Sequence, residues 1–263
     1  MIFNIYLRRP AAEIRNSNSF LLPMRHESMA KLEVPRVSRT EFLAFLENEA
    51  RIRIDGYIEN AVEVAEEVHS GLMREDGTSP FLETHTWPVT IDVANHYRNV
   101  TRNITSVEIA AAILHDVMED DERILNLYES KSYGFDAYLE YRFGSKIRDI
   151  ATELKIRPLE NYPGKNDAER GLARFHEYCD ILQGADYDIK AIKLADRLNN
   201  MTFIRTVPGH DKIRRYTREA EDFYIAYTMM PPKMPEFYNR MRNAYEQLRS
   251  LPVREAITAQ QHS

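Results

Sequence analysis

The sequence predicts an all-α fold, in which a bundle of amphipathic helices occupies most of the 263 residues. Apolar residues recur at three- and four-residue spacing over long segments, as they do on one face of a helix. No stretch alternates β-branched and polar residues in the manner of a strand, and no internal repeat is found. Proline-rich pieces separate the helical segments and are typical of connectors. Together these features favour helices packed on helices.

The N-terminal residues 1–37 show no sustained periodicity, and we expect a weakly structured lead-in. The helical body is predicted to begin at Ser38, because Ser38 and Glu41 have the spacing of a capping box. A long helical pattern then continues to about His69, with Gly56 as the point where it could break.

A second capping box, Thr105 with Glu108, opens the next clear helix. Further helical patterns are predicted near 136–156, 167–183, 188–204, 211–228 and 235–250. The last is amphipathic, and we expect it to pack on the core, with a homodimer contact as the alternative. The predicted organisation is therefore a lead-in (1–37), a helical domain (38–228), and a C-terminal helix and tail (229–263).

Composition restricts the classes of function. The net charge of −6 gives no overall basic field that would draw the chain to nucleic acid. The single cysteine, Cys179, suits a reducing compartment, and we interpret it as a small apolar residue rather than a catalytic thiol. The N-terminus is too polar for a signal peptide, and no apolar run approaches the ~18 residues that a membrane span needs. We therefore expect a cytoplasmic protein that binds neither nucleic acid nor a membrane.

The most informative segment is an apolar run that ends in His115-Asp116 and continues to Glu119-Asp120. If the segment is one continuous helix, His115 and Glu119 share a face, and so do Asp116 and Asp120. Burying this many polar groups is costly unless a cation compensates. Imidazole and carboxylate ligands suit Mn, Fe or Zn. The alternative is a helix that leaves the core and ends in solvent with acidic residues.

Two distant segments favour the metal interpretation. His85 follows a segment that contains Arg74 and Gly77, and Asp196 precedes Asn200 by four residues on an amphipathic segment. Helical bundles often build metal sites from side chains that project inward from facing helices. The pattern therefore predicts a four-ligand site formed by His85, His115, Asp116 and Asp196.

These motifs resemble the HD phosphohydrolase superfamily, whose ligand pattern is H…HD…D. More narrowly, they are similar to the hydrolase domain of the RelA/SpoT proteins and to the small single-domain alarmone hydrolases, including metazoan SpoT homologues. The HDxxED motif is His115–Asp120, and the KLADRLxNM motif is Lys193–Met201. The resemblance covers roughly residues 55–228. The family pattern A..H.G..R..dG.py..H is matched by Ala65, His69, Gly71, Arg74, Gly77, Pro80 and His85.

The chain departs from the family pattern in three places. Two residues, Thr86 and Trp87, separate His85 from Pro88, where the family usually has proline directly after the histidine. Asp121 stands where the family often has threonine. The stretch 122–144 is longer than usual and suggests a local insertion. None of these departures removes a predicted ligand.

The resemblance implies an HD-domain helical bundle that binds manganese through His85, His115, Asp116 and Asp196. It also implies that Glu119 and Asp120 are not ligands but orient or deprotonate the attacking water and protonate the leaving oxygen. The alternative for this pair is ordinary solvation of a helix end.

Four further residues are candidates for substrate binding. The resemblance places Arg74 and Asn200 against the nucleotide, with an unrelated surface charge as the alternative for Arg74. Tyr216 falls at a tyrosine that approaches the nucleotide, and it could equally be a core residue. Lys193 could bind phosphate or form a structural ion pair.

The function that the resemblance implies is metal-dependent removal of the 3′-diphosphate from the alarmones ppGpp and pppGpp, which yields GDP or GTP and pyrophosphate. The second interpretation keeps the chemistry but changes the nucleotide, for example an NADPH phosphatase or another nucleotidase. The third is non-catalytic: a toxin-neutralising protein or a nucleotide sensor. Because little chain follows the last predicted helix, we expect a stand-alone hydrolase without the synthetase domain of the long RelA/SpoT proteins.

Overall fold

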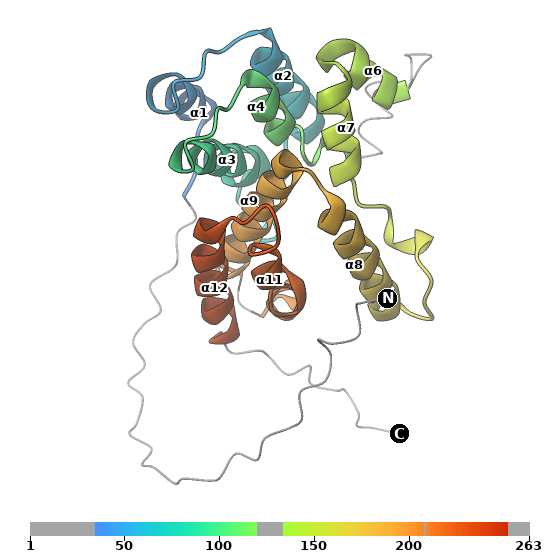
Figure 1. Cartoon of the computed structure of the whole chain (residues 1–263). Helices are drawn as coiled ribbons and strands as arrows, with labels where there is room; N and C mark the ends of the chain where they lie inside the picture. Colours follow the sequence, from blue (N-terminus) through green and yellow to red (C-terminus); the bar gives the residue numbers. More distant parts are fainter. Residues whose placement is uncertain (1–34, 120–133, 208, 252–263) are drawn as a thin grey trace, which may run out of the picture. The chain divides into compact units, whose positions relative to one another are not determined.

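The computed structural model describes residues 35–119, 134–207 and 209–251. Within these ranges the chain forms helices and turns (Figure 1). Its extended pairing there is an isolated bridge between Met73 and Pro80. The predicted all-α fold is confirmed. The predicted lead-in, 1–37, lies almost entirely outside the described ranges. Among the described helices, none is long and apolar enough to cross a membrane.

Helices of three kinds follow one another along the chain. The first half contains the α-helices α1 (Arg39–Ala44), α2 (Gly56–His69), α3 (Trp87–Asn99) and α4 (Ser106–Ile113), the π-helical turns η1 (Phe45–Glu49) and η2 (Leu82–Thr86), and the 3₁₀ turn η3 (Val117–Glu119). The second half contains α6 (Gly134–Phe143), α7 (Ser145–Leu154), η4 (Leu159–Asn161), α8 (Asp167–Gly184), α9 (Tyr187–Ile204), α10 (Asp211–Glu219), η5 (Ala220–Tyr224), α11 (Ile225–Tyr227) and α12 (Pro235–Arg249).

Local side-chain chemistry sets where several helices begin. Both predicted capping boxes form, at the N-termini of α1 and α4. The predicted break near Gly56 occurs because the carboxylate of Asp55 accepts hydrogen bonds from the backbone N–H groups of Tyr57 and Ile58 and so starts α2. Such caps typically contribute about 1 kcal/mol each.

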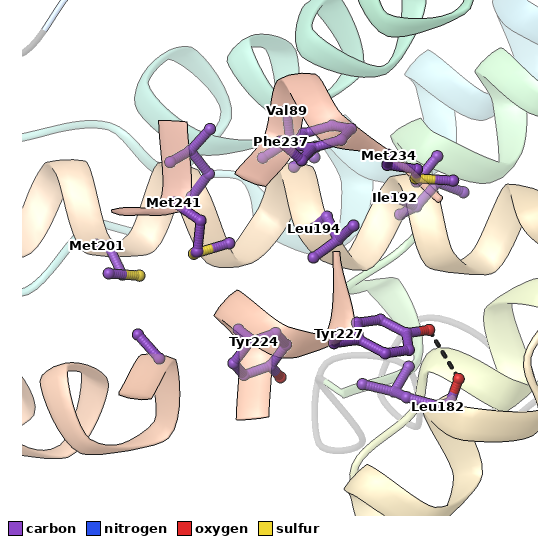
Figure 2. Packing of buried hydrophobic residues seen from close by; sticks show 14 of the residues in the cluster. Val89, Leu182, Ile192, Leu194, Met201, Tyr224, Tyr227, Met234, Phe237 and Met241 are labelled. Carbon is purple, nitrogen blue, oxygen red and sulfur yellow. Dashed lines mark hydrogen bonds between the residues drawn. The ribbon is translucent and has the colours of Figure 1, made fainter. Parts of the chain in front are cut away.

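The core consists of two clusters of buried apolar side chains. In the first, α2 packs on α4. In the second, α9 packs against both α3 and α12. Figure 2 shows Phe237 and Met241 of α12 directed at α9, and a hydrogen bond from the Tyr227 hydroxyl to the carbonyl of Leu182. The two oxygen atoms of this bond are 2.7 Å apart. The predicted packing of the C-terminal helix on the core is therefore observed.

The prediction of one continuous helix through His115–Asp120 is wrong. Helix α4 ends at Ile113, and a turn leads from it into η3. The imidazole Nδ1 of His115 donates to the carbonyl of Ala112 at 2.8 Å, and that carbonyl would accept from the N–H of residue 116 if the helix continued. The four-residue spacings in this motif therefore do not define shared helix faces, and Asp120 lies outside the described ranges.

The helical pattern predicted near 136–156 is two helices rather than one. Gly144 adopts a φ of 79°, which separates α6 from α7. A residue with a side chain would be strained at this φ, so glycine permits the turn. Residues 134–143 of the predicted insertion form α6, which buries Leu139 and Phe143. Residues 122–133 of the insertion lie outside the described ranges.

Candidate metal centre

Four side chains from three separate segments meet at one point. His85 lies on η2, His115 and Asp116 lie in the turn after α4, and Asp196 lies on α9. One potential ligand atom of each residue lies within 4.8 Å of those of the other three. The four residues that the sequence predicts as ligands are therefore brought together.

His85 is carried by a π-helical turn that runs directly into α3. A π turn holds one more residue than an α turn, and such turns are frequent at functional sites. Trp87 is buried and stacks on Phe42 with ring centroids 4.7 Å apart. Pro88 lies in the first turn of α3. The fold thus accommodates the two residues that separate His85 from Pro88.

Hydrogen bonds fix which nitrogen of each histidine carries the proton. Nδ1 of His115 faces the Ala112 carbonyl, which only accepts. Nδ1 of His85 lies 2.8 Å from the side-chain oxygen of Asn199, whose amide nitrogen donates to the carbonyl of Thr84 at 3.2 Å. Both Nδ1 atoms therefore donate, and both Nε2 atoms are left as bare acceptors.

These bare acceptors converge on one another and on a carboxylate. The Nε2 atoms of His85 and His115 are 3.1 Å apart, and an Asp116 oxygen lies 2.8 Å from the first and 3.1 Å from the second. Three lone pairs that point together repel unless a cation lies among them. The donor set therefore fits a divalent metal ion.

The electrostatics of the cluster also favour added positive charge. Burial lowers the pKa of His115, but Asp116 and Asp196 outweigh it and raise that pKa to about 9. Burial raises the pKa of Asp116, yet His115 and His85 lower it well below its ordinary value. Without a metal ion the cluster would hold a proton instead, so a metal ion that binds here displaces that proton.

Asp196 is held on two sides by residues of its own helix. Nζ of Lys193 lies 2.6 Å from one carboxylate oxygen, and the amide nitrogen of Asn200 donates to the other at 2.5 Å. Burial raises the pKa of Asp196, but Lys193 and the histidines lower it more, and the net pKa is below the ordinary value. Of the two alternatives for Lys193, phosphate binding and a structural ion pair, the structure shows the ion pair.

A cavity of about 530 Å³ opens beside the cluster. His85, Asp116 and Asp196 form part of its wall, and Glu75 and Glu219 contribute acidic groups. Most of its charged lining is cationic and comes from Arg74, Arg174, Lys193, Arg197, Lys212 and Arg215. The cavity is therefore suited to an anionic ligand that reaches the metal centre.

The predicted substrate residues all line this cavity. Tyr216 is buried, and the guanidinium of Arg197 lies 4.7 Å from its ring centroid. Arg74 is only 6% exposed and donates to Asn199 and Asn200. A substrate contact by Arg74, Asn200, Lys193 or Tyr216 stays a prediction.

The other candidates are placed as follows. Glu119 is the last residue of η3, close in sequence to Asp116, and its catalytic role with Asp120 stays a prediction. His69 is buried and meets Phe81 edge-on at 4.9 Å. Burial raises the pKa of Cys179 to about 12, which leaves the thiol protonated and unreactive at neutral pH.

Two comparisons with known proteins bear on this arrangement. The family profile described as HD domain matches residues 61–226. A solved structure of a metazoan orthologue of SpoT, which hydrolyses ppGpp and plays a role in starvation responses, is similar with a TM-score of 0.52. The two sequences are 16% identical, and the match covers 76% of this chain and 98% of that one. At this identity the likeness shows a shared fold.

Proposed function

This chain belongs to the HD-domain family, and from that premise we propose that it is a metal-dependent 3′-pyrophosphohydrolase of ppGpp and pppGpp. The observation that carries the proposal is the convergence of His85, His115, Asp116 and Asp196 beside a cavity rich in arginine and lysine. The fold shared with the metazoan SpoT orthologue supports the choice of substrate class.

The four clustered side chains would hold the divalent ion, which we propose is Mn²⁺. When bound, such an ion lowers the pKa of a coordinated water and polarises a phosphate ester. Lys193 and Asn200 keep the Asp196 carboxylate ionised and fixed in orientation. Arg174 and Arg215, which no sequence motif predicted, supply charge for phosphate groups at the cavity wall.

Glu119 and Asp120 would transfer the protons. One carboxylate takes the proton from the attacking water, and the other gives a proton to the leaving oxygen. Water attacks the proximal 3′-phosphorus, and the bond from that phosphorus to the nucleoside 3′-oxygen breaks. The products are GDP or GTP and pyrophosphate, and no single phosphate is released.

Product chromatography tests the substrate. The purified protein with Mn²⁺ is given ppGpp, pppGpp, NADPH and 3′-AMP at equal concentration. We expect pyrophosphate from the first two. We also expect 3′-AMP to be a poorer substrate by roughly tenfold to a hundredfold, because one lost charge-assisted contact costs about 1.5–3 kcal/mol. If NADPH released orthophosphate faster than ppGpp released pyrophosphate, the protein would be an NADPH phosphatase instead. If the protein bound these nucleotides but hydrolysed none of them, a nucleotide sensor would be favoured.

Removal of one ligand tests the metal centre. Because His115 is buried and its Nε2 faces the other donors, His115→Ala should abolish binding of the divalent ion. Elemental analysis of the purified variant measures this. The matched control is His176→Ala, which changes an exposed histidine outside the cavity. A His115→Ala protein that keeps a full complement of metal would refute the ligand assignment.

A carboxamide pair tests the proton transfers. Glu119→Gln with Asp120→Asn should keep the bound metal but lower turnover by about 10²–10⁴-fold, the usual contribution of general acid–base groups. Steady-state kinetics with ppGpp measures the loss. The control is Glu221→Gln with Asp222→Asn, which changes two exposed acidic residues that are also adjacent in sequence. Near-normal turnover by the first double variant would contradict the assigned roles.

A further inference from the structure

We propose that Arg74 is a positioning residue of the metal centre, which acts through two adjacent amides to orient two metal ligands. Its guanidinium donates a hydrogen bond to Asn199, which is hydrogen-bonded to His85. It donates a second hydrogen bond to Asn200, which donates to Asp196. The inference rests on the proposed metal site and assigns work to Arg74 and Asn199 that the ligand pattern does not include.

The guanidinium forms a fork over two consecutive residues of α9. One terminal nitrogen donates to the side-chain oxygen of Asn199 at 3.0 Å, and the other donates to the side-chain oxygen of Asn200 at 2.8 Å. An arginine can only donate, so it forces both amides to turn their oxygen atoms toward it. The amide nitrogens must then point to acceptors.

The first branch sets the orientation of His85. The Asn199 oxygen that faces Arg74 also accepts from Nδ1 of His85, and the amide nitrogen is anchored on the carbonyl of Thr84. With the proton held on Nδ1, the other ring nitrogen presents its lone pair to the metal centre. If Asn199 were turned over, its N–H would face Nδ1 and favour the wrong tautomer.

The second branch sets the orientation of Asp196. With its oxygen held by Arg74, Asn200 can direct only its amide nitrogen at the carboxylate of Asp196, four residues earlier on the same helix. The oxygen that accepts this bond lies 3.6 Å from Nε2 of His85. Arg74 therefore acts on two ligands that come from different helical segments.

Arg74 is itself fixed by its surroundings. It is almost fully buried, its guanidinium lies 4.1 Å from the ring centroid of Phe203, and its Nε donates to Glu75 at 3.3 Å. Glu75 is held in turn by Lys212. A planar guanidinium can stack on a ring and bond to two amides at once, whereas a lysine ammonium has neither the plane nor the fork.

Metal affinity is the direct measurement. We compare Mn²⁺ binding, by competition with a chelator, in the wild type and in Arg74→Lys, Asn199→Ala and Asn199→Asp. Loss of a residue that orients a metal ligand typically weakens binding by about 10–100-fold, and we expect this for Arg74→Lys and Asn199→Ala. Asn199→Asp keeps an oxygen that accepts from both His85 and Arg74 but loses the N–H that donates to Thr84, so it should weaken binding less than Asn199→Ala does. Thr202→Ala, an exposed change on the same helix, is the control.

Two further readouts separate positioning from general loss of structure. The absorption spectrum of the Co²⁺-loaded protein reports ligand geometry and should change in Arg74→Lys but not in Thr202→Ala. In a background that already carries Asn199→Ala and Asn200→Ala, Arg74→Lys should weaken Mn²⁺ binding by less than about twofold, because the amides through which it acts are gone. A full additional loss in that background would place the effect of Arg74 elsewhere.

Several outcomes overturn the proposal. Unchanged Mn²⁺ affinity and Co²⁺ spectra in Arg74→Lys and Asn199→Ala would remove any positioning role. If Asn199→Ala does not fold, as judged by melting in the presence of chelator, Arg74→Lys, which keeps the positive charge, decides the question alone. A wild-type protein that binds no divalent ion would instead overturn the proposed function, which is a distinct result.

Discussion

At the scale of single residues, Glu75 shows how the cavity wall depends on ionisation. Its carboxylate pairs with Lys212 and lies 3.3 Å from Nε of Arg74. Burial raises the pKa of Glu75, but these partners lower it more, from 4.5 to about 2. A carboxyl group whose pKa is lower in the folded state stabilises the fold above its unfolded pKa. That contribution is present above about pH 4.5 and disappears as the pH falls toward 2.

We therefore expect Glu75→Gln to lower the free energy of unfolding at pH 7 by at most about 3 kcal/mol, since each pKa unit corresponds to about 1.4 kcal/mol. The difference from the wild type should shrink between pH 4.5 and about 2, where Glu75 itself becomes neutral. Urea unfolding of the metal-free proteins measures this, with the exposed Glu221→Gln as control. A difference that stays constant down to pH 2.5 would show that Glu75 acts through packing alone.

The four candidate metal ligands could be predicted from the sequence, but the residues that orient them could not. His85, His115, Asp116 and Asp196 are found from the sequence because metal ligands are restricted to a few side-chain types. Asn199 occupies the unspecified position of the KLADRLxNM motif, and its partner His85 is 114 residues away. Only the folded chain shows that this amide faces an imidazole.

At the scale of elements, helix starts were predictable and helix ends were not. The capping boxes at Ser38 and Thr105 are local and formed as expected. Helix α4 ends where the His115 side chain donates a hydrogen bond to the carbonyl of Ala112. This bond replaces a backbone hydrogen bond of the helix, and the spacing of apolar residues gives no sign of it. The π-helical turn that carries His85 is likewise invisible to a 3.6-residue pattern.

Helix α12 lies beyond the matched family segment, yet its apolar face belongs to the core. Phe237 is fully buried, so Phe237→Ala should lower the free energy of unfolding by about 3–5 kcal/mol. The control is Asn239→Ala, an exposed change on the same helix that should have almost no effect. Chemical denaturation compares the two. Equal stability of both variants would show that α12 is an appendage.

At the scale of the whole molecule, the clustered ligands join the two core clusters. Leu114 and Val117, which lie on either side of His115 and Asp116, belong to the first cluster. Ala195 and Leu198, which lie on either side of Asp196 in α9, belong to the second. An ion that binds all four ligands binds the folded chain far better than the unfolded one. Its binding free energy is therefore added to the free energy of unfolding.

Saturating Mn²⁺ should raise the melting temperature, and a chelator should reverse the effect. At a free ion concentration of 100 times Kd the stabilisation is about 2.7 kcal/mol. For a domain of this size that corresponds to a rise of roughly 5–10 °C. Scanning calorimetry with and without chelator measures it. The same rise in His115→Ala would show that Mn²⁺ stabilises the protein from another place.

The separation of the ligands along the chain also has a consequence in time. During synthesis His85, His115 and Asp116 emerge first, and Asp196 follows only when α9 has been made. At typical rates of translation the interval is on the order of ten seconds. A nascent chain in this interval has three of the four donors but not the helix that closes the centre. The complete set of four donors thus exists only after α9 has left the ribosome, and a chain interrupted before α9 would be released without it.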